Sequence, residues 1–177
     1  MFKLNFQNNN HSIGVAVTHL DHKSEELREK QIRQGIQQTE KQMLRELSHV
    51  VCGDFNTFQK SDCSDISWNN ILNLYAQNGW PEPMEKSLVL EALREKGYED
   101  TYYNSVDFRC RQEEDEEAMY PQPTAWTNRP LMRIDHVFLK NCNLSKTQFE
   151  VKSHCCGSDF EGSDHFPIAV DLQILEE

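Results

Sequence analysis

The chain has 177 residues, of which 37% are hydrophobic and 27% are charged, so it is long enough for one soluble domain with a buried core. Its formal charge of -11 excludes a broadly basic nucleic-acid-binding face. No apolar run approaches the roughly 18 residues that a membrane span needs, and no signal peptide is visible. The six cysteines form no C-x-x-C pair, so the spacing typical of a zinc site is absent. The adjacent Cys155 and Cys156 are poorly placed for an ordinary disulfide, which favours reduced thiols. We therefore expect a cytoplasmic or nuclear protein without a membrane span.

The N-terminal part of the chain predicts a strand, helix, strand unit. Residues 2–6 and 13–17 are strand-like segments on either side of a turn-forming stretch, which predicts a β-hairpin. Ser24 is a suitable N-cap, and apolar residues at helical spacing then predict an amphipathic helix over residues 24–47. Val50–Cys52 follows as a short apolar strand. This order is typical of the crossover unit of a layered α/β fold.

The rest of the chain predicts further helices and strands around one polar segment. Residues 110–123 contain five consecutive acidic side chains, which predicts a mobile acidic surface loop. Helices are expected over residues 65–78 and 84–96, and strands over residues 124–126, 134–139, 149–151 and 168–174.

Polar side chains recur where four of the predicted strands begin or end. If these strands lie side by side, three carboxylates, one carboxamide and two imidazoles meet at one rim. Oxygen ligands can hold Mg²⁺ or Mn²⁺, and a carboxylate or an imidazole can move a proton near neutral pH, so such a rim suits the hydrolysis of phosphoesters. The residues concerned are His19, Asp54, Asn56, Asp135, Asp164 and His165.

The stretches that carry these side chains resemble the endonuclease/exonuclease/phosphatase superfamily of deoxyribonuclease I-like metal-dependent hydrolases. The matching stretches are Val17–His22, Cys52–Asn56, Thr124–Trp126, Arg133–Phe138 and Gly162–Ile168. The resemblance implies an α/β (α+β) sandwich of the deoxyribonuclease I-like type. It also implies that residues 1–177 form a single domain that corresponds to the C-terminal portion and is missing much of the N-terminal half, with the early Asn and the metal-binding Glu that the half carries.

The same resemblance implies a role for each residue at the rim. Asp54 and Asn56 are expected to position or deprotonate the attacking water, and Asp135 to orient a catalytic His165. Asp164 is expected to bind Mg²⁺ or Mn²⁺, together with Asp54 and Asn56. His19 is similar to a second histidine of the deoxyribonuclease I-like branch and is expected near the scissile phosphate.

Two classes of function remain open on the sequence alone. The first is a metal-dependent phosphodiesterase, possibly a nuclease, whose phosphoester substrate is a nucleic acid, a nucleotide, an inositol phosphate or a lipid headgroup. The second is a catalytically impaired fragment, or a non-catalytic binding remnant, that lacks the metal-ligand Glu. Without a covering first half, the apolar side chains of five strand residues are expected to be exposed and to favour association, although the sequence does not set the oligomeric state. These residues are Val15, Val17, Val51, Val137 and Ile168.

Overall fold

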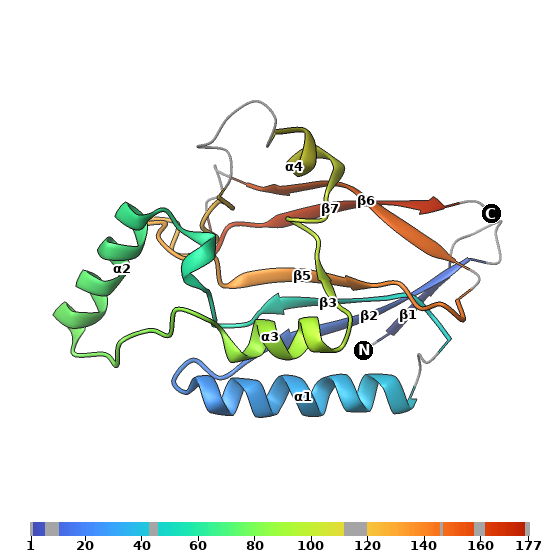
Figure 1. Ribbon diagram of the computed structural model, residues 1–177, viewed down its shortest axis with the longest axis horizontal. Coiled ribbons are helices and arrows are strands. Elements are labelled where there is room, and N and C mark those ends of the chain that lie inside the picture. Colours follow the sequence, from blue (N-terminus) through green and yellow to red (C-terminus); the bar gives the residue numbers. More distant parts are fainter. Residues whose placement is uncertain are drawn as a thin grey trace.

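A computed structural model describes residues 2–5, 11–42, 46–111, 120–145, 147–157 and 162–175. It contains two sheets and four α-helices within these ranges (Figure 1). The strands are β1 (Phe2–Asn5), β2 (Ser12–His19), β3 (His49–Asp54), β4 (Glu99–Asp100), β5 (Asp135–Lys140), β6 (Gln148–Cys156) and β7 (Ile168–Leu175). The helices are α1 (Glu25–Gln42), α2 (Asp65–Asn78), α3 (Leu88–Glu95) and α4 (Val106–Arg111), with a short 3₁₀ turn at Lys60–Asp62.

The larger sheet has five strands in the order β1-β2-β3-β5-β4. The predicted hairpin is confirmed, because β1 pairs antiparallel with β2. The predicted crossover is confirmed as well, because β2 and β3 pair in parallel and α1 connects them. β5 then pairs antiparallel with β3. As a result, β2 and β3 end at the same edge of the sheet where β5 begins, and polar groups at these positions must meet.

Two helices cover one face of this sheet (Figure 1). Ile32 and Ile36 of α1 lie four residues apart, so they share one helix face, and both are buried. They pack with Leu90 and Leu93 of α3 and with Phe138 of β5. The core therefore fixes the strand that carries Asp135 against two helices.

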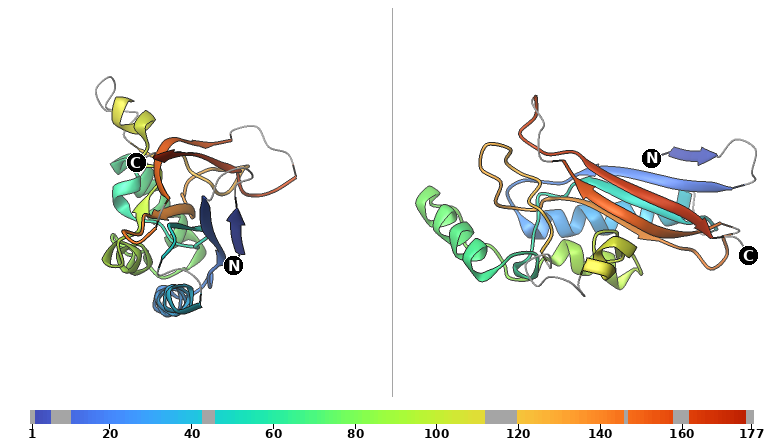
Figure 2. Two further views of the ribbon diagram at one scale, coloured as in Figure 1. Left: turned by 90° about the vertical axis from the view of Figure 1, so that its right-hand side faces the viewer. Right: turned by 90° about the horizontal axis from the view of Figure 1, so that it is seen from above.

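The smaller sheet, β6 paired with β7, covers the other face. The left view of Figure 2 shows α1 below the larger sheet and the β6–β7 hairpin above it. Phe149 and Val151 of β6 are buried there against Val50 and Leu139. This hairpin therefore covers part of the apolar surface that was expected to be exposed.

The five residues expected to be exposed differ in their outcome. Val51 is 4% exposed because its side chain lies on the helix-covered face. Val15 and Val137 are partly buried against the hairpin, and Ile168 has intermediate exposure within it. Val17 is 62% exposed, as expected.

Several element boundaries differ from the sequence prediction. The helix expected over residues 84–96 begins at Leu88, because the Ser87 hydroxyl accepts a hydrogen bond from the backbone N–H of Leu90 and caps the helix there. The strand expected over residues 124–126 is reduced to isolated bridges at Ala125. α4 and β4 were not predicted. Residues 112–119 of the expected acidic loop lie outside the described residues, and none of the described helices is long and apolar enough to cross a bilayer.

Candidate active site

Three neighbouring strands bring three of the predicted site residues into one row. His19 is paired with Asp54 across β2 and β3, and Asp54 is paired with Asp135 across β3 and β5. Directly opposite residues on neighbouring strands point to the same face of a sheet. Strand register alone thus places an imidazole and two carboxylates side by side at the sheet edge.

Gly53 allows β3 to approach β2 closely just before Asp54. Its φ angle is 134°, and a Cβ atom added at this position would lie 1.9 Å from the backbone oxygen of Thr18. No side chain can occupy that space, and L-residues rarely adopt this backbone conformation. The glycine of the Gly-Asp-Phe-Asn stretch is therefore required by the contact between the two strands that carry His19 and Asp54.

The loop after β3 holds Asn56 against Asp54. Asn56 has a φ angle of 50°, in the left-handed region that asparagine tolerates better than most residues. Its backbone N–H donates to Oδ1 of Asp54 at 2.8 Å, and its Nδ2 donates to the backbone oxygen of Leu20 at 3.0 Å. A weaker contact of 3.3 Å joins Nδ2 to Oδ2 of Asp54. Two sequence-predicted residues are thus held together by a turn of their own segment.

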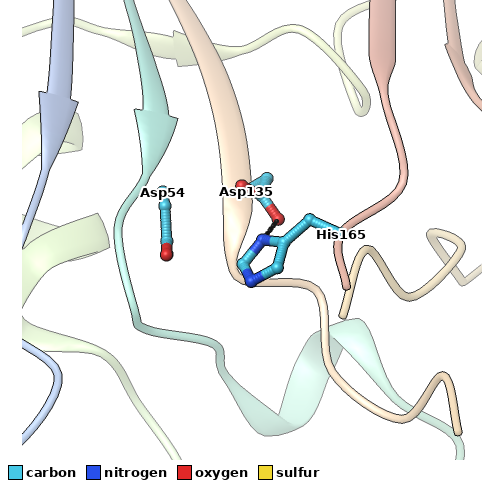
Figure 3. A group of neighbouring side chains, drawn as sticks. All are labelled: Asp54, Asp135 and His165. Atoms are coloured by element: carbon cyan, nitrogen blue, oxygen red, sulfur yellow. Dashed lines mark hydrogen bonds and ion pairs between the residues drawn. The ribbon is translucent and has the colours of Figure 1, made fainter. Parts of the chain in front are cut away.

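His165 reaches the same edge from the segment before β7. Its Nδ1 lies 2.8 Å from Oδ2 of Asp135, so the imidazole donates a hydrogen bond to the carboxylate and leaves Nε2 for another group (Figure 3). Figure 3 shows the ring directly below the carboxylate of Asp135, with Asp54 to its left and Nε2 turned away from Asp135. This is the arrangement of a carboxylate that fixes both the orientation and the tautomer of a histidine.

Thr124 and Ala125 connect the two members of this dyad, and the sequence analysis missed the role of Thr124. The buried hydroxyl of Thr124 accepts hydrogen bonds from the backbone N–H groups of Ile134 and Asp135, both at 3.0 Å. Ala125 forms an antiparallel bridge with His165. One short segment thus holds the start of β5 and the segment of His165. The Thr-Ala-Trp stretch was noted in the sequence, but nothing in it indicated a hydroxyl that accepts two backbone hydrogen bonds.

The environment of Asp54 shifts the pKa of its carboxyl group upward. Burial raises the pKa of Asp54 above 3.8, and the nearby carboxylate of Asp135 raises it further. The N–H of Asn56 and the two histidines oppose this rise in the pKa of Asp54 without cancelling it. His19 Nε2 lies 3.5 Å from Oδ2 of Asp54, but the His19 side chain is 75% exposed. Any cation or proton that joins Asp54 and Asp135 therefore relieves a repulsion that is present in the folded chain.

The residues at this edge fit a divalent cation in their donor chemistry. One carboxylate oxygen each from Asp54 and Asp135 and one ring nitrogen of His165 lie within 4.8 Å of one another. Two carboxylates and an imidazole suit Mg²⁺ less well than Mn²⁺, since Mg²⁺ prefers oxygen. Asp164 is exposed and does not belong to this group among the described residues, although it directly precedes His165. Its backbone oxygen accepts a hydrogen bond from the N–H of Thr127.

A buried charged network lies behind the edge and was also missed. The guanidinium of Arg133 donates two hydrogen bonds to the carboxylate of Asp100, at 2.9 and 2.7 Å. Although burial alone would raise the pKa of Asp100, the charge of Arg133 holds it far below its usual range. His136 is fully buried, and its Nε2 lies 3.0 Å from the backbone oxygen of Thr57. These contacts flank Asp135 on both sides in the chain, so they fix the beginning of β5.

Comparison with known proteins agrees with this fold. The model of the endonuclease/exonuclease/phosphatase family matches residues 13–165, and the chain belongs to that family. No match was found among the curated proteins compared with it.

Three solved structures resemble the chain at low sequence identity. The human Nocturnin catalytic domain with bound sulfate has a TM-score of 0.61 and 16% identity, over 98% of this chain and 51% of that one. An endonuclease/exonuclease/phosphatase family protein from Bacteroides thetaiotaomicron has a TM-score of 0.59 and 17% identity, over 97% of this chain and 53% of that one. The mannosyl-6-phosphatase Bt3783 of the same species has a TM-score of 0.55 and 17% identity, over 94% of this chain and 53% of that one. The chain therefore spans about half the length of these structures and has the deoxyribonuclease I-like fold as a partial-length member.

Proposed function

We propose that this chain contributes the general acid–base part of a metal-dependent phosphoester hydrolase site. The observation that carries the proposal is the convergence of Asp54, Asp135 and His165 within 4.8 Å, from three separate segments of the chain. Family membership supports the same reaction class, because members are hydrolases of phosphoesters. Nucleic acids, nucleotides and smaller phosphoesters all belong to the proposed substrate class.

The proposed reaction uses water as the nucleophile. Asp54 accepts a proton from that water. The backbone N–H of Asn56 holds Asp54 in place, and the side-chain NH₂ group of Asn56 can donate to a phosphate oxygen. A bond forms between the water oxygen and phosphorus as the bond from phosphorus to the leaving oxygen breaks. His165, held through Nδ1 by Asp135, donates a hydrogen bond or a proton from Nε2 to an oxygen on phosphorus. His19 adds a second imidazole beside Asp54.

Asp54 is the described carboxylate that would hold Mg²⁺ or Mn²⁺, and Asn56 and the exposed Asp164 are further proposed ligands. Asp135 is engaged by Nδ1 of His165, so Nε2 of His165 stays free to donate to phosphate. When bound, the cation would neutralise charge on the phosphate. The chain's own residues would still have to orient the water and move the protons.

The test is hydrolysis of bis-p-nitrophenyl phosphate and of single-stranded and nicked DNA, with Mg²⁺ or Mn²⁺ and with EDTA. Chelator-sensitive release is expected. Asp54→Asn should lower kcat by about 10²- to 10⁴-fold, since it removes the proton acceptor. Asp107→Asn changes an exposed carboxylate in α4 and should leave the rate unchanged. Equal rates with and without EDTA, or equal rates for the two variants, would contradict the proposal.

A non-catalytic binding role is the second candidate. The observation in its favour is that, among the described residues, no glutamate lies close enough to join Asp54, Asp135 and His165 as a metal ligand. Calorimetric titration separates the two candidates. Tight Mg²⁺ or Mn²⁺ binding that Asp54→Asn abolishes supports the hydrolase, whereas weak binding together with no turnover supports the binding role.

A further inference from the structure

Five aromatic rings form a continuous row beside the candidate active site. The successive ring centroids from Trp68 to Phe58, Tyr75, Trp80 and Trp126 are 6.0, 6.1, 5.2 and 6.4 Å apart. Trp68 and Phe58 are buried at one end of the row, whereas Trp80 is 43% exposed. The row therefore runs from the core to the exposed Trp80 and on to Trp126, which is partly buried against the same core.

The row borders both segments that supply site residues. Phe58 lies two residues after Asn56 in the loop that follows β3. At the other end, Trp126 lies between Ala125, which bridges to His165, and Thr127, whose N–H donates to the backbone oxygen of Asp164. Figure 1 shows α2, which carries Trp68 and Tyr75, beyond the end of the sheet where β3 stops and β5 starts. The exposed Trp80 and the partly buried Trp126 thus flank the edge at which phosphate is proposed to react.

Trp80 is held rigidly although it is not part of the core. It follows the left-handed Gly79 that ends α2, and its backbone N–H donates to the backbone oxygen of Tyr75 at 3.0 Å. Its ring packs edge-on against Tyr75, with an interplanar angle of 84°. An aromatic ring that is fixed and half exposed is a suitable stacking surface for a nucleobase, because every base has a π-face and little side-chain entropy is lost.

A positive charge lies on the same turn as Trp126. Arg129 closes this turn by donating its backbone N–H to the backbone oxygen of Trp126 at 2.9 Å. Its side chain is exposed and forms no ion pair with the described residues, in a chain whose formal charge is -11. A guanidinium without an ion-pair partner among the described residues, close to one exposed and one partly buried tryptophan, suits a surface that binds the backbone and the bases of a single strand.

We infer that Trp80, Trp126 and Arg129 form a subsite for a nucleotide that neighbours the scissile phosphate of a single-stranded nucleic acid. The base stacks on Trp80 and Trp126, and the next phosphate pairs with Arg129. This inference rests on the proposed function and narrows its substrate class from phosphoesters in general to polynucleotides. A sugar phosphate or a small diester would have no second phosphate for Arg129.

Binding can be measured without cleavage in an Asp54→Asn background with Mg²⁺ present. The probes are a fluorescent oligothymidylate of about ten nucleotides and an abasic strand with the same number of phosphates. Trp80→Ala should raise the Kd for oligothymidylate by about ten-fold or more and leave the Kd for the abasic strand unchanged. Trp80→Phe should restore most of the affinity. Met84→Ala, which shortens another exposed side chain of the same loop, is the matched control and should have no effect.

The contribution of Arg129 has a different readout. Arg129→Gln should weaken binding of both strands and lower the slope of log Kd against log salt by about one, because one phosphate contact is lost. Equal effects of Trp80→Ala on the two strands, or no binding of oligothymidylate, would overturn the subsite. Hydrolysis of bis-p-nitrophenyl phosphate by the parent chain, with and without chelator, tests the proposed function separately. Base-dependent binding without that hydrolysis would leave the subsite standing and reject the hydrolase.

Discussion

Asp54 and Asp135 are directly opposite each other on the antiparallel strands β3 and β5, so their carboxylates share one face of the sheet. Like charges in this position destabilise a strand pair. The neighbouring Asp135 contributes, after burial, to the raised pKa of Asp54. The fold thus retains an electrostatic repulsion at the edge of its main sheet, which is typical of a functional site.

Asp135→Asn should keep the His165 imidazole at the site but disturb its orientation and tautomer. The amide can present its NH₂ group to Nδ1, which favours the wrong tautomer of the imidazole, and it no longer stabilises the protonated ring. We expect kcat on bis-p-nitrophenyl phosphate to fall by about 10²- to 10⁴-fold with little change in KM. Asp65→Asn at the exposed start of α2 serves as the control. A rate within a factor of about two of the parent would show that the dyad has no role in turnover.

Asp54→Asn should change how stability depends on pH. Burial, with the charge of Asp135, raises the pKa of Asp54 above its value of 3.8. A carboxyl group with a raised pKa in the folded state contributes stability that is complete below 3.8 and is lost as the pH rises through the folded pKa. Asparagine does not ionise, so the variant should be more stable than the parent at about pH 7. The difference should shrink as the pH falls through the raised pKa of Asp54 towards 3.8.

Urea unfolding in EDTA over this pH range measures that difference. Chelation matters because a bound cation would stabilise the ionised carboxylate of Asp54 and reverse the sign. A variant that is less stable than the parent at neutral pH would contradict a raised pKa for Asp54.

Gly53→Ala should be strongly destabilising, and Gly35→Ala provides a contrasting control. At Gly53 the new methyl group would lie 1.9 Å from the Thr18 backbone oxygen, and the φ angle of 134° is strained for alanine. We expect a loss of at least about 3 kcal/mol in the free energy of unfolding. Gly35 lies inside α1 with no atom within 4 Å of an added Cβ, so alanine there should stabilise the chain by about 0.5–1 kcal/mol. Similar effects at both positions, measured by urea unfolding, would refute the close strand approach.

The alignment of His19, Asp54 and Asp135 at the sheet edge could be predicted, because each of these polar residues directly adjoins an apolar strand. The predicted pairing of parallel β2 and β3 is sufficient to bring His19 and Asp54 together. The predicted α2 coincides with the observed Asp65–Asn78, since Ser64 caps its start and Gly79 ends it. Local sequence signals of this kind depend on neighbouring residues only, so they can be read without knowing the fold.

Contacts between distant segments could not be predicted in the same way. The ion pair of Asp100 with Arg133 joins residues 33 positions apart, and no local pattern selects one partner among many. The hairpin of β6 and β7 covers a face that was expected to be bare, because its alternating apolar residues do not indicate which surface they will meet. The catalytic and metal-binding roles expected for the residues at the rim all remain predictions, including those of the exposed Asp164 and His19.

Thr124→Val tests whether a buried hydroxyl positions the dyad. Valine has nearly the same shape but cannot accept the hydrogen bonds from the N–H groups of Ile134 and Asp135. Two buried donors would lose their partner, so we expect the free energy of unfolding to fall by about 1–3 kcal/mol. kcat should fall as well, because Asp135 and His165 are both held through residues 124–125. Thr124→Ser keeps the hydroxyl and should retain most of the parent rate, although it removes a methyl group from a buried position. A serine variant as slow as the valine variant, with both folded by circular dichroism, would assign Thr124 to packing and not to positioning.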